Sequence, residues 1–137
     1  MTIEKTDTGW SLLQGRGAIT RVCIGRELVI RIEGEAPGTE LYELEVGALQ
    51  LITNGTVETF DARHDSPAQL GKLVELRSKR VVEWQVQDGG RCVVSLEANQ
   101  QLIAKPKMDV EAWQISSEDG LIVALPGGGV SIWGESP

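Results

Sequence analysis

The only histidine of the chain, His64, lies in the segment DARHDSP, together with Asp61 and Asp65. An imidazole and carboxylates at this spacing have the chemistry to exchange protons or to hold a metal ion. A catalytic zinc site, however, usually needs three protein ligands, often with a second histidine. We therefore expect a solvated loop and no metal. A small-ligand site at Asp61, His64 and Asp65 is the alternative interpretation.

Other signatures of catalysis are missing from the sequence. It contains neither a Gly-x-Ser-x-Gly nor a Ser-x-x-Lys motif. Three consecutive glycines, Gly127–Gly129, precede a short alternating segment, whereas a phosphate-binding loop needs a helix at that point. We interpret them as a wide turn between two strands. The sequence thus predicts a non-catalytic protein without a cofactor.

A group of glutamates is the best candidate for a binding surface. Residues 33–45, EGEAPGTELYELE, contain five glutamates and no basic residue. In a strand, Glu43 and Glu45 share one face and Tyr42 and Leu44 the other. A basic protein would gain from such a surface through steering and pairing, and the candidate contacts are Glu35, Glu40, Glu43 and Glu45. The alternative is a solvated strand face that protects a sheet edge from aggregation.

Composition excludes several classes of partner. The formal charge of −7 argues against nucleic-acid binding through phosphate contacts. No apolar run approaches the ~20 residues that cross a membrane, and the N-terminus lacks the apolar core of a signal peptide. Cys23 and Cys92 lie in apolar, strand-like runs and are expected to be buried thiols. We therefore expect a cytoplasmic protein.

Apolar residues mostly alternate along the chain. Residues 28–32 and 42–46 each place an apolar side chain at every second position. This period is typical of strands with one face on a core and one in water, as in antiparallel sheets. Asn54-Gly55 and Asp119-Gly120 are signals for tight hairpins.

The strand pattern occurs twice. Residues 48–57, ALQLITNGTV, resemble residues 112–123, AWQISSEDGLIV, and similar matches recur at offsets of about 61–65 residues. We interpret this as an internal duplication within a single domain, 1–137, with pseudo-repeats at about 12–62 and 75–134.

One segment, at about 66–78, has the period of a helix. Ser66 and Gln69 form a capping box, and Pro67 suits the first helical position. Leu70, Leu73 and Val74 make one apolar face. This helix links the two repeats, and residues 9–15 are expected to form a shorter counterpart before the first.

These elements define the expected fold. It is mainly β, with two tandem β-meander repeats linked by one α-helix, arranged either as a barrel or as two packed sheets. A barrel has no edges, whereas packed sheets leave edge strands. Open edges would allow a homodimer to form by strand pairing.

Four tryptophans supply most of the aromatic bulk. Trp84 is in phase with its apolar neighbours and is expected in the core. Trp113 and Trp133 fall out of phase, and packing in a second core is favoured over an aromatic binding surface for both.

Three segments also carry a family resemblance. They are ITRVCIGRELVIRIEG, FDARHDSPAQL and EAWQISSEDGLIVALPGGGVSIW. In them the chain resembles an uncharacterised bacterial family of small all-β proteins over residues 12–134, and the tail signature EAW…LPGG…W is the most specific part. The resemblance implies a bacterial cytosolic protein of unknown function and brings no catalytic residues.

Taken together, the sequence predicts a non-catalytic binding protein that presents an acidic surface to a basic protein partner. Small acidic proteins of this kind are similar in character to immunity proteins, which neutralise toxins. The alternatives are a small-ligand or metal-binding protein centred on His64 and a structural module that oligomerises through strand edges.

Overall fold

The computed structural model describes residues 3–12, 17–35 and 40–134. These residues form thirteen strands of one antiparallel sheet and a single helical segment, so the predicted mainly-β class with a linking helix is confirmed. The strands are β1 (Ile3–Lys5), β2 (Gly9–Leu12), β3 (Gly17–Ile24), β4 (Leu28–Gly34), β5 (Leu41–Val46), β6 (Ala48–Thr53), β7 (Thr56–Asp61), β8 (Arg80–Gln87), β9 (Cys92–Leu96), β10 (Gln100–Ala104), β11 (Trp113–Ser117), β12 (Gly120–Ala124) and β13 (Val130–Gly134).

The two halves of the chain exchange hairpins. In the first half, β3, β4 and β5 form a meander, but the next hairpin, β6–β7, pairs with β10 of the second half. The second half repeats this plan, because β8, β9 and β10 form a meander and the hairpin β11–β12 pairs with β5. The strand order is therefore β13-β12-β11-β5-β4-β3-β8-β9-β10-β6-β7.

The strand order follows the same pattern on both sides of the β3–β8 pair: each meander of three strands is followed by a hairpin from the other half of the chain. Leu44 lies between Ile30 and Ile115 in the pairing of β4, β5 and β11. Leu102 lies between Val94 and Leu51 in the pairing of β9, β10 and β6. The two sets of strands thus occupy equivalent places in the sheet. Duplication of an ancestral unit remains our interpretation of this correspondence.

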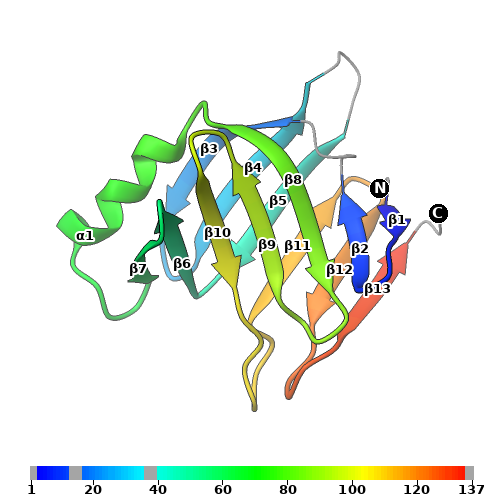
Figure 1. The fold of residues 1–137 in the computed structure, drawn as a ribbon. Coiled ribbons are helices and arrows are strands. Elements are labelled where there is room, and N and C mark those ends of the chain that lie inside the picture. Colours follow the sequence, from blue (N-terminus) through cyan, green and yellow to red (C-terminus); the bar gives the residue numbers. More distant parts are fainter. Residues whose placement is uncertain (1–2, 13–16, 36–39, 135–137) are drawn as a thin grey trace.

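The sheet folds back on itself into two layers (Figure 1). Trp84 of β8 and Tyr42 of β5 are separated by two strands in the sheet order, yet their rings meet edge to face at 5.3 Å. Such a contact is made across a core rather than along a sheet. The sheet is not closed. Of the two arrangements expected, the structure therefore has packed layers with edge strands, and not a barrel.

Side chains at every second position of the strands fill the core between these layers. Leu28, Ile30 and Ile32 of β4 are fully buried. Tyr42 and Leu44 of β5 are buried in the same way, while the residues between them face outward. Burial of each such side chain contributes roughly 1.5–3 kcal/mol of hydrophobic free energy. The period-two pattern in the sequence therefore predicts the core correctly for these strands.

The linking helix is shorter than the predicted segment, 66–78. It runs as α1 (Pro67–Gly71) and then tightens into a 3₁₀ turn, η2 (Lys72–Leu76). The hydroxyl of Ser66 accepts a hydrogen bond from the backbone N–H of Gln69 at 3.2 Å, which confirms the expected N-cap. The segment ends where Ser78 takes a positive φ of 77°.

The helical segment packs on the core through Leu70, Leu73 and Leu76, whereas Val74 is exposed. The expected apolar face, with Val74 in place of Leu76, is therefore wrong at its end. A 3₁₀ turn has three residues per turn, and this tighter winding brings Leu76 onto the face of Leu73.

The expected short helix at residues 9–15 is also wrong in its described part. Residues 9–12 form strand β2, which pairs with β8 through Trp10 and Val86. Residues 13–15 lie outside the described residues. The two apolar side chains that alternate with small residues here, Trp10 and Leu12, suit a strand better than a single helical turn.

The triple glycine forms the turn between β12 and β13, as expected. Gly127, Gly128 and Gly129 all have positive φ, which is strained for other residues. The turn packs against the β8–β9 turn, and a Cβ added to Gly128 would lie 3.1 Å from the carbonyl oxygen of Gly89. Beside it, the buried indole of Trp113 donates a 2.8 Å hydrogen bond to the carbonyl of Gly90.

Both cysteines are free thiols. Cys92 is buried, and its sulfur accepts a 3.3 Å hydrogen bond from Trp84 Nε1. Burial raises the pKa of the Cys92 thiol to about 12, and the hydrogen bond from Trp84 offsets this only in part. Cys23 is half-buried on β3. The two thiols therefore differ in the access that they give to reagents.

No helix among the described residues has the length and apolar character of a membrane span. The helical segment there is too short and too polar to cross a lipid bilayer.

Replacement of Gly128 and of Gly71 by alanine should have opposite effects. Gly128→Ala introduces a Cβ at a φ of 111° against Gly89, and should lower the free energy of unfolding by about 1–3 kcal/mol. Gly71→Ala lies in a helix with open space around it and should raise that free energy by about 0.5–1 kcal/mol. Urea denaturation measures the free energy of unfolding of both variants. Equal effects of the two substitutions would contradict the packing of the triple-glycine turn against the β8–β9 turn.

Native-state alkylation should separate the two cysteines. Iodoacetamide at pH 8 should modify Cys23 and spare Cys92 until the chain is unfolded in guanidinium, because only the thiolate reacts and the Cys92 thiol stays protonated. Mass spectrometry of tryptic peptides measures the modified fraction at each site. Comparable modification of both thiols in the native state would contradict the burial of Cys92.

Candidate functional site

The strand that carries two of the four predicted acidic contacts, Glu43 and Glu45, is β5, and it lies inside the sheet. It pairs with β4 on one side and with β11 on the other. On its outer face, Glu43 lies opposite Ser116 and Glu45 lies opposite Gln114. The expected alternative, a charged face that protects a sheet edge, therefore does not apply to these glutamates, because β5 is not an edge strand.

A large cleft lies at one end of the β5–β11 pair. It has a volume of about 710 Å³ and combines the start of β5 with the turn that joins β11 to β12. Its walls consist mainly of oxygen-bearing side chains, with a single large apolar residue. The lining residues are Glu40, Leu41, Glu43, Ser116, Ser117, Glu118 and Asp119.

A smaller cleft of about 150 Å³ lies at the other end of the same strand pair. Three further carboxylates line it, from the β3–β4 turn, from β5 and from the residues before β11. They are Glu27, Glu45 and Glu111. The carboxylates of the two clefts form a line that we call the acidic seam: Glu27, Glu40, Glu43, Glu45, Glu111, Glu118 and Asp119.

Two arginines neutralise part of the acidic seam. Arg31 Nη2 lies 3.2 Å from a carboxylate oxygen of Glu43, and Arg63 Nη2 lies 3.5 Å from one of Glu27. Both pairs are partly exposed and are worth at most about 1 kcal/mol each. Within the described part of the chain, no ion pair involves Glu45 or Glu111. The seam thus keeps an excess of negative charge.

The large cleft also contains hydrogen bonds between its own groups. The buried Tyr42 hydroxyl donates to Glu40, and the Ser117 hydroxyl donates to Asp119 at 3.0 Å. These contacts hold two carboxylates in place at the mouth of the cleft. Carboxylates fixed in this way suit recognition of a cation.

The structure separates one of the four predicted partner contacts from the others. Glu40, Glu43 and Glu45 lie on the acidic seam, whereas Glu35 forms a 3.0 Å ion pair with Arg80 of β8. Their role in binding stays a prediction.

Sequence reasoning missed the other members of the acidic seam. Glu111, Glu118 and Asp119 flank or follow β11, which the hairpin exchange brings beside β5. Their only signal in the sequence is that Glu111 precedes, and Glu118 and Asp119 lie within, the segment 112–123 that matches residues 48–57. Glu27, in the β3–β4 turn, carries no such signal.

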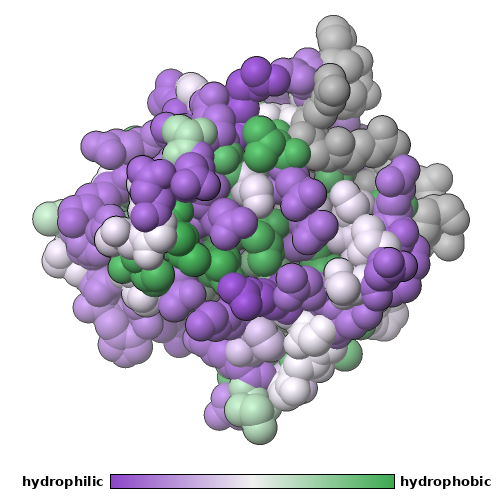
Figure 2. All heavy atoms as spheres, viewed as in Figure 1, coloured by the Kyte–Doolittle hydropathy of each residue, from purple (hydrophilic) through white to green (hydrophobic). Residues whose placement is uncertain are grey.

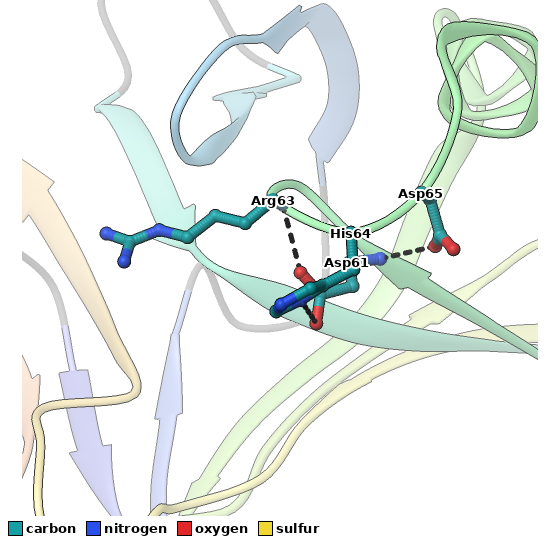
Figure 3. A network of polar contacts seen from close by, with 4 residues as sticks. All are labelled: Asp61, Arg63, His64 and Asp65. Carbon is teal, nitrogen blue, oxygen red and sulfur yellow. Dashed lines mark hydrogen bonds and ion pairs between the residues drawn. The ribbon is translucent and has the colours of Figure 1, made fainter.

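The predicted alternative site is a loop network (Figure 3). His64 Nδ1 lies 3.0 Å from a carboxylate oxygen of Asp61, while the His64 side chain is 81% exposed. The Asp65 carboxylate instead accepts a 2.7 Å hydrogen bond from the backbone N–H of Asp61. The other Asp61 oxygen accepts one from the Arg63 N–H at 3.0 Å. These carboxylates thus order the loop before α1.

This geometry gives His64 little means to hold a ligand. Only Asp61 faces it, and the hydrogen bond with His64 holds the pKa of Asp61 below its usual value of 3.8. Among the residues that the structure describes, no three histidine, cysteine, aspartate or glutamate side chains are grouped to hold a metal ion. The loop thus contains an Asp61–His64 pair, and its second carboxylate, that of Asp65, is turned to the backbone.

The His64→Ala substitution tests this pair through pH. Because the folded-state pKa of Asp61 is depressed, its contribution to stability is present above pH 3.8 and is lost as the pH falls through the lower folded-state value. His64→Ala should therefore cost less than about 1 kcal/mol at pH 6, and the difference from wild type should shrink as the pH falls below 3.8. Urea denaturation across this range measures it; a pH-independent difference would contradict the pairing.

Comparison with known proteins gives one match. No curated protein and no solved structure matches the chain. The model of one protein family matches residues 11–134, which is nearly the whole chain, and that family is described as one of unknown function. The expected membership of an uncharacterised family is thereby confirmed. The chain belongs to DUF6188, a family of unknown function.

Proposed function

We propose that the protein is a non-catalytic binding protein whose acidic seam recognises a basic protein partner. The observation that carries this proposal is the position of β5 inside the sheet. Carboxylates on an edge strand have a structural use, because they prevent edge-to-edge aggregation. On β5 that use is absent, and in the described part of the chain Glu45 lies there without an ion pair, whereas Glu43 pairs with Arg31.

The equivalent strands of the other half support this interpretation. β10 and β6 occupy the place that β5 and β11 have in the first half, but the position of Glu45 is taken by Ile103 and that of Glu43 by Gln101. The small cleft there is lined by Ile103, Lys105 and Lys107 in place of carboxylates. Figure 2 shows hydrophobic residues gathered over β10, β6 and β7 on this face. The fold thus does not require acids at these positions.

The chemistry of the acidic seam suits a cationic protein surface. A concentration of negative charge speeds encounter with a basic partner, and the clefts at both ends give room for lysine or arginine side chains. The serines of the large cleft have no histidine beside them, since the only one of the chain lies on the exposed loop before α1. This composition favours binding over catalysis.

The biological setting that we propose follows from the same features. A small acidic protein that masks a basic partner acts as immunity proteins do, and two free thiols fit a reducing compartment such as the cytoplasm. Pairing of two copies through β7 or β13, the strands at the ends of the sheet order, stays a prediction.

Charge neutralisation along the acidic seam tests the proposal. The triple variant Glu45→Gln, Glu111→Gln, Glu118→Gln removes three carboxylates that lie on the two clefts. A basic protein captured from extracts of the source cells by the wild type should bind this variant about tenfold or more weakly at 50 mM salt, and the difference should shrink at 500 mM. Titration calorimetry with the purified partner gives both dissociation constants.

A matched control removes the same charge elsewhere. Asp7→Asn, Glu75→Asn and Glu83→Gln lie at exposed positions that line neither cleft, and this variant should bind within about twofold of the wild type. If both triple variants lost affinity equally, the loss would reflect the change in net charge and not the position of the carboxylates. Affinity that does not depend on salt, or capture of only acidic proteins, would refute the acidic seam as the binding surface.

A further inference from the structure

The sequence pattern places Trp133 in a packed core. In the structure its side chain is 63% exposed, whereas Trp113 is 2% exposed. On β13, Val130 and Ile132 pack against the core, so Trp133 points to the outer face. The expectation of packing is therefore correct for Trp113 and wrong for Trp133. A tryptophan with this much of its surface in water is a common feature of binding sites.

Strand register puts Trp133 in line with the acidic seam. Glu43, Ser116, Leu121 and Trp133 lie directly opposite one another in turn across β5, β11, β12 and β13. Neighbouring strands are about 4.8 Å apart, so the row spans roughly 14 Å from Glu43 to Trp133. An extended partner segment that crosses the strands can contact the carboxylates and the indole together.

Apolar side chains complete this surface. Leu121 is the cross-strand neighbour of Trp133, and Leu41, which lines the large cleft, is 41% exposed. The large cleft therefore has one apolar side chain, Leu41, in its wall. The apolar pair Leu121 and Trp133 lies farther across the sheet, on β12 and β13. Exposed apolar residues rimmed by charge mark a binding surface more often than scattered ones do.

The ring of Trp133 is open to a cation. On β2, Trp10 already has one, because Lys5 Nζ lies 4.2 Å from the centre of its ring. In the described part of the chain no such contact involves Trp133. The β11–β12 turn lies beside this end of β13, because Gly120 pairs with Gly134, and the turn carries Glu118 and Asp119. Carboxylates beside the strand favour a cation over the indole and disfavour an anionic lipid surface.

We propose that Trp133 and Leu121 form the platform for an arginine side chain of the basic partner, beside the large cleft of the acidic seam. This inference rests on the proposed function and adds the kind of residue that is recognised. A guanidinium group is planar, stacks on an aromatic face and pairs with a carboxylate through two hydrogen bonds. A lysine ammonium is more strongly hydrated and gains less from the indole.

Two peptides of equal charge test the platform. Acetylated and amidated octa-arginine and octa-lysine are titrated into the full chain at 50 mM salt, and affinity is read by calorimetry and by the shift of tryptophan emission. The wild type should bind octa-arginine about three- to tenfold more tightly than octa-lysine. Trp133→Ala should reduce this ratio to about one, and Trp133→Phe should keep part of it.

Two further variants separate this inference from the proposed function. Val57→Ala removes an exposed apolar side chain of β7, away from the seam, and should keep the wild-type preference. The Glu45→Gln, Glu111→Gln, Glu118→Gln variant should bind both peptides more weakly. A preference that survives Trp133→Ala, or no preference in the wild type, overturns the platform but leaves the acidic seam intact. Failure of the wild type to bind either peptide overturns both.

Discussion

The structure depends on the pairing of strands from opposite halves of the chain. β5 is completed by β11 and β10 by β6, so the third strand of each meander would be an exposed edge without the hairpin from the other half. Backbone groups left unpaired at such an edge favour association with other chains. Hairpin exchange supplies their partners within one chain. The acidic seam is a product of this constraint, because its carboxylates come from both sides of the β5–β11 pairing.

Sequence reasoning succeeds where local chemistry decides the outcome. Alternation in β4 and β5 fixes which side chains face the core, and the Ser66 hydroxyl forms the cap that its position predicts. Sequence reasoning fails where the outcome depends on which strands lie side by side. Alternation assigns a face to Glu45 but says nothing of which strand lies beside it, so Glu111 was not recognised as its neighbour. Trp133 was misplaced because its strand was not known to have a solvated outer face.

Equivalent strand positions in the two halves carry chemically different side chains. The backbone positions of Glu45 and Ile103 correspond in strand order and register, yet one lines an acidic cleft and the other lies beside two lysines. Packing constrains the inner faces of both layers alike, as the buried pairs Leu44–Ile115 and Leu102–Leu51 indicate. On the outer faces, Ile103 is buried at 2% exposure whereas Glu45 is half-buried in a cleft, so equivalent positions there can acquire separate roles.

The exchange of hairpins also bears on the time at which the surface comes into being. Leu44 is synthesised before Ile115, its partner across β5 and β11, with the whole of β6 to β10 between them in the chain. Contacts between such distant parts of a chain form slowly, after their loops have closed. A nascent first half therefore presents neither complete cleft, and the acidic surface exists only after β11 has paired with β5.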